Sequence, residues 1–183
     1  MLLMGKTFLL VHLRVKDLTA ETAEETIRKR IDGGEKLRKL ERAELWEFRH
    51  SREGGEFRSE LERLVRRSNL FVNPNKHAYR IVDDYRSGWE EEGFLLWVRG
   101  KEGVEGMVAR ETLRTRFGLE GLEEVRYGVL WVIRPAGIAG EDALAWARKI
   151  GITTGPRDGL LVHPHYQEYD LDRTIPPRKE GTR

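Results

Sequence analysis

The sequence contains no cysteine, no long apolar run and almost no net charge. Without cysteine, the chain cannot form disulfides, bind a metal through thiolates or use a cysteine nucleophile. No stretch approaches the ~20 apolar residues that a membrane-spanning helix needs. The 33 basic and 31 acidic side chains leave a formal net charge of only +2. This balance excludes a strong long-range attraction to nucleic acid or anionic membranes, although a local basic patch remains compatible with it.

The first residues are apolar but do not follow the pattern of a signal peptide. The run MLLMGKTFLLVHLRV is interrupted by charges, and it lacks a basic flank and a small-residue cleavage site. We therefore interpret it as a strand and expect a cytoplasmic protein. The chain has 183 residues, of which 39% are apolar and 35% charged. This composition predicts a globular protein of one ordinary domain or two small ones.

Two similar stretches suggest that part of the sequence is repeated. LFVNPNKHAYRI surrounds Pro74, and LLVHPHYQEYDL surrounds Pro164. Tyr79 and Tyr169 have the same separation in the sequence as the two prolines. A proline after a short apolar run ends regular structure, because it has no N–H and restricts the residue before it. Each stretch predicts a helix exit, a proline turn and a closing strand, and the repetition indicates an internal duplication.

Hydrophobic periodicity predicts the same order of elements in both halves, namely strand, helix, strand, helix, strand. The first helix is predicted to be capped by Thr19 and to end at Gly33-Gly34. The other helices are predicted over residues 57–70, 104–117 and 141–150. The strands are predicted over residues 7–15, 43–49, 78–82, 94–98 and 125–134, with a last strand after Pro164.

Further matches align the two halves with each other. FLLVH begins at Phe8, and the similar FLLWV begins at Phe94. Trp46 and Trp131 each follow a leucine, and their separation is nearly the same as that of the two phenylalanines. The loop ITTGPRDG, residues 152–159, accounts for the larger separation of the proline turns. These matches predict that Phe8 is equivalent to Phe94, and Trp46 to Trp131.

The predicted fold class is α+β, with two tandem ferredoxin-like βαβαβ units that form a pseudo-dimer. A unit of this size cannot cover both faces of its own sheet, so we expect the two sheets or their edges to meet. The predicted divisions are a first unit at residues 1–83, a linker at 84–92, a second unit at 93–172 and a flexible tail at 173–183.

We expect the helices to lie on one face of each sheet. A strand–helix–strand segment normally makes a right-handed crossover, which places the helix over one face of a parallel pair. The other face is then expected to be sealed by Trp46, Trp97 and Trp131. The apolar positions of the helix over residues 104–117 are Met107, Val108, Leu113 and Phe117.

The order of these parts resembles PurS, the small subunit of phosphoribosylformylglycinamidine synthase. That family has an opening strand, a helix, a strand with a Val-Arg-x-Gly motif, a charged helix, a leucine-rich Asn-Pro turn and a closing strand. In this chain VRYG at residues 125–128 matches the first motif, and LFVNP at residues 70–74 matches the second. The resemblance covers residues 6–83 and 93–172, as two fused PurS-like units.

This resemblance implies a role in purine biosynthesis. The amidotransferase joins glutamine-derived ammonia to formylglycinamide ribonucleotide and consumes ATP. A glutaminase subunit releases the ammonia, a synthetase subunit uses it, and PurS bridges the two. We therefore expect a non-catalytic bridging subunit without metal or cofactor, whose partners are the synthetase and glutaminase subunits. Since loops often carry contacts, the expected partner-contact residues are those of the two proline turns: Asn73, Pro74, Asn75, His163, Pro164 and His165.

His163 and His165 also raise the alternative of a metal site. Neutral imidazoles are common metal ligands, and residues two apart in a strand share a face. A third ligand would have to come from His12, His50, His77 or a carboxylate. A surface turn is the simpler interpretation.

Two functions of other classes stay open. A nucleotide or a purine intermediate could occupy a cleft between the halves, as ligands often do at such interfaces. RNA binding would use exposed aromatics and basic helix faces, although nearby glutamates make these faces more typical of solvated surface. The segment from Trp89 to Glu92 is interpreted as a solvated linker. The basic faces are formed by Arg63, Arg66 and Arg67, and by Arg28, Lys29 and Arg30.

Overall fold

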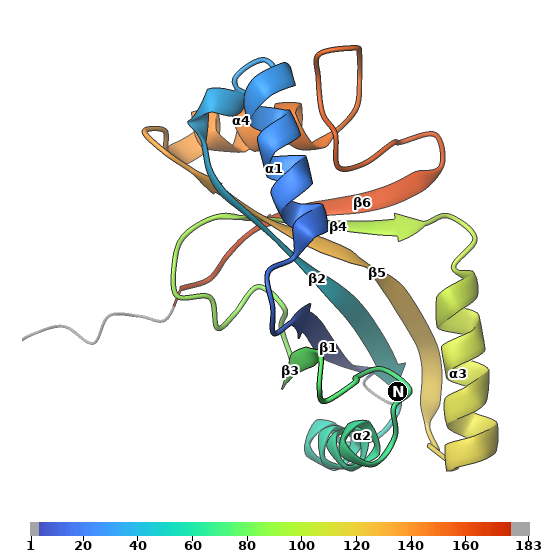
Figure 1. The fold of residues 1–183 in the computed structure, drawn as a ribbon. Helices are drawn as coiled ribbons and strands as arrows, with labels where there is room; N and C mark the ends of the chain where they lie inside the picture. Colours follow the sequence, from blue (N-terminus) through green and yellow to red (C-terminus); the bar gives the residue numbers. More distant parts are fainter. Residues whose placement is uncertain (1–3, 177–183) are drawn as a thin grey trace, which may run out of the picture.

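The computed structural model describes residues 4–176, which adopt an α+β fold (Figure 1). Within these residues six strands form one antiparallel sheet, joined by four α-helices and a short 3₁₀-helix. The elements are β1 (Gly5–Leu13), α1 (Leu18–Arg30), η1 (Gly34–Lys36), β2 (Leu37–His50), α2 (Gly54–Arg67), β3 (His77–Val82), β4 (Phe94–Gly100), α3 (Val104–Phe117), β5 (Leu122–Pro135), α4 (Gly140–Gly151) and β6 (Gln167–Arg173).

The strand order is β3-β1-β2-β5-β4-β6. β2 and β5 are the long central strands and pair along their whole length, from Leu37↔Pro135 to His50↔Leu122. β1 and β3 complete one side of the sheet, and β4 and β6 complete the other. The two sets of three strands therefore meet edge to edge in one continuous sheet.

The crossover expected between the first two strands of each half is absent, because β1 and β2, and likewise β4 and β5, are antiparallel neighbours. The next connection of each half does join parallel strands, since β2 and β3 both pair antiparallel with β1, and β5 and β6 both pair antiparallel with β4; α2 and α4 lie in these connections. β1 pairs only with the second half of β2, so the first half of β2 extends beyond the end of β1. α1 runs along this overhang, where the Leu40 N–H donates to Glu24 at 2.8 Å and Arg28 Nε donates to the Leu37 carbonyl at 2.9 Å. After β1 the chain thus continues in the same outward direction as α1, and then returns as β2, the antiparallel neighbour of β1.

The central strands place the two repeated tryptophans in matching positions. Trp46 and Trp131 occupy the same place within their strands, counted from the first residue of β2 and of β5. Glu44 pairs with Val129, and these two residues have the same separation in the sequence as the tryptophans. A residue that pairs with its own counterpart lies at the centre of a two-fold arrangement. The register is therefore compatible with a ferredoxin-like duplication.

The predicted equivalence of Phe8 and Phe94 is wrong by one residue. Leu9 and Leu96 are the residues of β1 and β4 that pair with the two strand tryptophans, so Leu9 is equivalent to Leu96 and Phe8 to Leu95. Successive strand residues point to opposite faces, so a shift of one residue changes the face. Phe94 accordingly packs under the helices, whereas Phe8 lies on the other face of the sheet.

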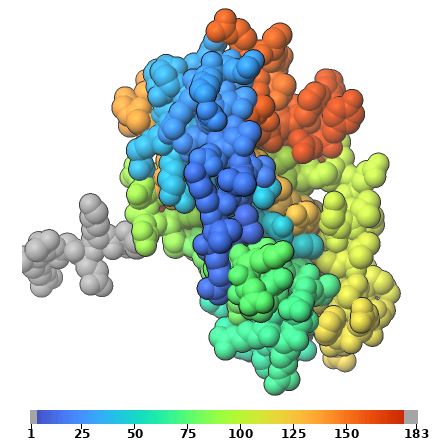
Figure 2. Space-filling model, viewed as in Figure 1, coloured from blue at the N-terminus to red at the C-terminus, as the bar shows by residue number. Residues whose placement is uncertain are grey.

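Two clusters of buried side chains lie under the helices, and each contains one helix from either half of the chain. α1 and α4 share a cluster with β4 and β5, whereas α2 and α3 share a cluster with β1 and β2. Figure 2 shows this exchange at the surface, where the blue atoms of α1 lie against orange atoms from the C-terminal part. Since each half contributes a helix to the other's core, neither half buries its apolar face alone.

α3 has the predicted bounds, but only one of the four apolar positions in its sequence is buried. Leu113 is buried, together with the small residues Gly106 and Ala109, whereas Met107, Val108 and Phe117 are exposed. The cause is a close approach between α3 and β5. A Cβ at Gly106 would lie 2.2 Å from the Val125 carbonyl oxygen, so only glycine fits there, and the small face of the helix turns inward.

The face of the sheet away from the helices is covered differently from the prediction. A third cluster there includes Phe8, Trp97 and Tyr85, with Trp89 packed against it. Of the three tryptophans expected on this face, only Trp97 lies there, because Trp46 and Trp131 point toward the helices. The polar segment between β3 and β4 thus supplies the cover that the strands do not.

The N-cap of α1 and the end of the described chain differ in detail from the sequence interpretation. Asp17, and not Thr19, caps α1, since its carboxylate accepts from the N–H groups of Thr19 and Ala20. After β6, Thr174 is buried and the Ile175 N–H donates to the Arg86 carbonyl at 2.7 Å. The rest of the predicted tail, residues 177–183, lies outside the described residues.

Candidate functional site

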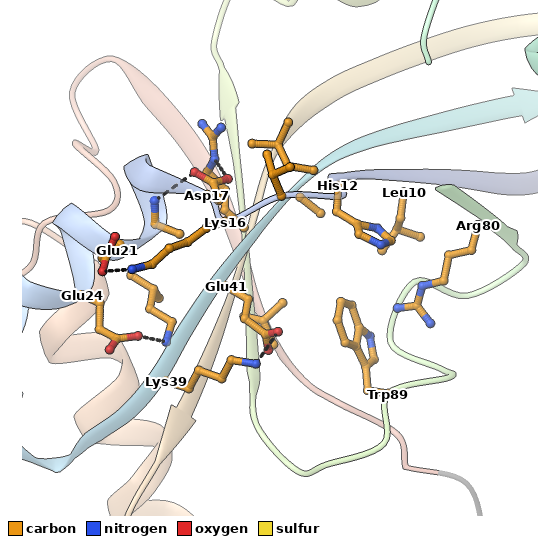
Figure 3. A pocket seen from close by; sticks show the side chains of 17 residues that line it. Leu10, His12, Lys16, Asp17, Glu21, Glu24, Lys39, Glu41, Arg80 and Trp89 are labelled. Carbon is orange, nitrogen blue, oxygen red and sulfur yellow. Dashed lines mark hydrogen bonds and ion pairs between the residues drawn. The ribbon is translucent and has the colours of Figure 1, made fainter. Parts of the chain in front are cut away.

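A cavity of about 490 Å³ lies where β1 ends and α1 begins (Figure 3). Its walls come from β1, β3, the overhanging half of β2, the first turns of α1 and the segment before β4. This volume is typical of pockets that bind small molecules. The lining residues are the apolar Leu10, Leu13, Val15, Ala20, Leu40, Ala43 and Val132, the aromatic Trp89, and the polar His12, Lys16, Asp17, Glu21, Glu24, Lys39, Glu41, Arg42 and Arg80.

Two basic side chains meet at one end of the cavity. In the β1–β3 ladder, Arg80 pairs with Leu10 and His12 pairs with Ala78. His12 and Arg80 are therefore diagonal neighbours on the same face of the sheet. Figure 3 shows both side chains beside Trp89, at the end of the cavity away from Lys16 and Glu21.

Arg80 is held in place without a carboxylate. Its Nη1 donates to the carbonyls of Ser87 and Gly88 at 3.2 and 2.8 Å, and its guanidinium lies 4.2 Å from the centre of the Trp89 ring. Its Nη2 is buried and has no acceptor among residues 4–176. Burial lowers the pKa of Arg80, because a charged group loses hydration there. Gly88 has a φ of +75°, which suits glycine and turns its carbonyl toward the guanidinium.

His12 is exposed to the cavity and forms no ion pair within the described chain. Partial desolvation by the cavity walls lowers the pKa of His12, and the positive charges of Arg80 and Arg14 lower it further, whereas Glu41 raises it. The imidazole is therefore biased toward its neutral form. A negative group bound between His12 and Arg80 would reverse this bias, since it favours the protonated ring.

The other charged side chains of the cavity balance one another. Glu41 pairs with Lys39 at 2.9 Å and with Arg134 at 3.0 Å. Asp17 pairs with Arg42 at 2.9 Å. Lys16 pairs with Glu21, and Glu24 pairs with Arg28. The uncompensated positive charge is thus confined to the His12–Arg80 end.

The residues predicted as partner contacts form two turns of matching geometry. In the first turn the N–H groups of Lys76 and His77 donate to the Asn73 carbonyl, and in the second those of Tyr166 and Gln167 donate to the His163 carbonyl. Equivalent residues of the two turns have the same separation in the sequence as the two prolines. Each turn leads into an outermost strand of the sheet, β3 or β6. The two groups of predicted contact residues therefore lie at opposite edges and do not form one site.

A side chain at the end of each turn completes it. The Asn73 N–H donates to His77 Nδ1 at 3.2 Å, and the His163 N–H donates to Gln167 Oε1 at 2.8 Å. The same role is filled by an imidazole in one turn and by an amide in the other. The matching geometry therefore persists although the side chains differ.

The second turn presents a cluster of rings. The rings of His163 and His165 are 5.4 Å apart, and those of His163 and Tyr166 are 5.1 Å apart. Between residues 4 and 176, no group of three or more histidine, aspartate or glutamate side chains is arranged to hold a metal ion. The two histidines thus stand as surface aromatics in the described structure.

Sequence reasoning overlooks the main residues of the cavity. It treats His12 only as an additional metal ligand, does not single out Arg80 and places Trp89 in a solvated linker. The alternation of β1 is the available signal, because it puts Leu10 and His12 on one face. The pair of aromatic residues Tyr85 and Trp89 in a polar segment is another, since both turn out to cover that face.

Comparison with known proteins identifies no relative of this chain: no family model matches it, and neither the curated proteins nor the solved structures contain a match. No helix among residues 4–176 combines the length and the apolar character needed to cross a membrane.

Proposed function

We propose that this chain is a non-catalytic bridging subunit of PurS type. Residues 1–83 and 93–172 are two tandem units of a pseudo-dimer in this proposal, with residues 84–92 as the link. The synthetase and glutaminase subunits of a phosphoribosylformylglycinamidine synthase are its partners. The order of the sequence motifs supports the proposal, and so does the register of the central strands, in which Glu44 pairs with its own counterpart Val129.

The observation that carries the proposal is the pair of matching proline turns. Both have the same backbone hydrogen bonds, and each precedes an edge strand. Of the six turn residues, Asn73 and Pro164 are half-buried and anchor the loops, whereas the other four are exposed. A small protein that offers two similar loops at opposite edges can contact two partners at once.

Co-purification and activity together test this proposal. The full chain is expressed with candidate synthetase and glutaminase subunits, and glutamine-dependent amidation of formylglycinamide ribonucleotide is measured. We expect a three-component complex whose activity with glutamine requires this chain. The variants Asn75→Arg and His165→Glu should each weaken assembly, because they place a bulky charge at an exposed turn. Thr115→Glu on α3 is the matched control. No complex and no rescue of activity would refute the proposal.

A second candidate function is a stand-alone module that binds a small ligand. The cavity beside α1 favours it, because most of the surface of its walls is apolar and its charges are unbalanced at one end only. A ligand that binds only the folded state raises the melting temperature. Thermal denaturation of the isolated full chain with and without a nucleotide or purine intermediate therefore tests this function independently of any partner.

A further inference from the structure

We propose that the cavity binds a small organic anion, with its phosphate or carboxylate group between His12 and Arg80 and a flat apolar body along the cavity wall. This inference rests on the second candidate function, small-ligand binding, and names its ligand class. Arg80 and His12 are two adjacent basic groups, and no carboxylate between residues 4 and 176 pairs with either. A partly buried guanidinium without a counter-charge is unfavourable unless an anion supplies one.

The other half of the sheet shows what a compensated version of this site looks like. Since Leu9 corresponds to Leu96 and Tyr79 to Tyr169, Arg99 is the counterpart of His12, and Asp170 is the counterpart of Arg80. Arg99 Nη1 lies 2.7 Å from Asp170 Oδ2. One half thus contains a built-in cation–carboxylate pair, whereas the same two positions in the other half hold two basic groups.

Arg80 is already oriented for an anion before any ligand arrives. Its Nη1 is bonded to two backbone carbonyls and its plane lies over the Trp89 ring. A fixed guanidinium loses little side-chain entropy on binding, and its fork of N–H donors suits oxyanions. His12, which is exposed, supplies a second donor from the neighbouring strand.

The rest of the cavity defines the body of the ligand. Leu10, Leu40 and Val132 form its apolar wall. The acidic groups of the cavity are paired with lysines and arginines, so none of them is a free negative charge that would repel an anion. An aromatic or heterocyclic body attached to one oxyanion group fits both features.

Calorimetric titration of the full chain at low salt tests this inference. AMP carries a flat body and a phosphate, and 2-naphthoate carries a flat body and a carboxylate. Adenosine has the body without the anion, and inorganic phosphate has the anion without the body. We expect AMP or 2-naphthoate to bind about tenfold or more tightly than adenosine, since a charge-assisted bond contributes at least that factor. Each should also bind more tightly than inorganic phosphate, which lacks the apolar body that the cavity wall would bury. The stronger of the two identifies the acidic group.

Two variants locate the binding to the His12–Arg80 end. Arg80→Gln removes the positive charge, but it also removes the hydrogen bonds from Arg80 that hold the segment before β4. His12→Glu avoids this problem, because it adds a carboxylate beside Arg80 at an exposed position. We expect His12→Glu to raise the melting temperature and to weaken anion binding about tenfold. Thr115→Glu, which places the same new carboxylate on exposed α3, should leave binding unchanged.

The outcomes separate this inference from the function on which it rests. Equal binding of AMP and adenosine, unaffected by His12→Glu, would overturn the anion site and leave a cavity for neutral ligands. No binding of any of the four compounds at about 1 mM would overturn both. Neither result bears on the PurS-type assembly, which is measured with different partners.

Discussion

Replacing Tyr85 by alanine should destabilise the fold although the residue lies in a polar segment between two strands. Tyr85 is 8% exposed, and its ring centre lies 5.2 Å from that of Phe8 and 5.8 Å from that of Trp97. Its hydroxyl donates to the carboxylate of Asp172 on β6. Burial raises the pKa of Tyr85, and the hydrogen bond to Asp172 raises it further. The phenol therefore stays protonated, and able to donate, above the usual pKa of a tyrosine.

The expected loss can be divided into two parts. Truncating a buried aromatic to alanine costs about 3–5 kcal/mol, because contacts are lost and a cavity remains. Tyr85→Phe keeps the ring and removes only the hydroxyl. We expect it to cost about 1.5 kcal/mol, the lower end for a bond to a charged group, because Asp172 is half-exposed and water can rehydrate it.

Urea denaturation followed by tryptophan fluorescence measures both free energies of unfolding. Arg86→Ala is the control, because Arg86 lies next in the chain and its side chain forms an ion pair, within residues 4–176, only with Asp84 at the surface. Its cost should stay within about 0.5 kcal/mol. If Tyr85→Ala costs no more than this control, the segment between β3 and β4 does not cover the sheet. The same result would remove the support that this segment gives to Arg80.

Two more predictions concern a close contact and a buried histidine. Gly106→Ala should cost about 1–3 kcal/mol in urea denaturation, because its Cβ would lie 2.2 Å from the Val125 carbonyl oxygen; Gly55→Ala, with open space around it, should instead stabilise by about 0.5–1 kcal/mol. His50 is fully buried, and burial lowers its pKa. A hydrogen bond to a backbone carbonyl offsets part of this decrease. As the pH falls, the unfolded state therefore takes up a proton on His50 at a higher pH than the folded state does. The free energy of unfolding should consequently fall as the pH drops below about 6.5 and through the pKa of the folded state. A wild-type pH profile indistinguishable from that of His50→Gln in this range would contradict this prediction.

The periodic parts of the sequence predict the secondary structure well. The bounds predicted for α3 are those observed, and the strand tryptophans occupy matching positions on the two central strands. Such patterns are informative because the packing of a strand or helix imposes a fixed spacing on apolar residues. The same periodicity does not specify the direction in which a chain returns after a helix. The antiparallel return of β2 depends on the overhang between strands of different length, which only the register reveals.

The cavity could not be predicted from the sequence for a related reason. His12 and Arg80 are far apart in the sequence and become neighbours only through the pairing of β1 with β3. Trp89 lies in a segment whose composition is typical of solvent-exposed linkers. Its burial depends on an apolar sheet face that no helix covers among the described residues. Local composition therefore indicates the wrong environment for a residue whose position is decided by distant strands.

The differences between matching positions concentrate where packing does not constrain the side chain. Leu45 and Leu130, which are counterparts on the central strands, are both fully buried, and a polar replacement at either would disrupt the same apolar cluster. At the rim of the same sheet face, the counterparts His12 and Arg99 differ in type, and Arg80 and Asp170 differ in sign. A buried position tolerates few side chains, whereas a rim position can exchange a carboxylate for a guanidinium at small cost to the fold. The absence of a carboxylate beside Arg80 among the described residues is thus not demanded by the packing of the sheet, and this supports a ligand as the source of the missing negative charge.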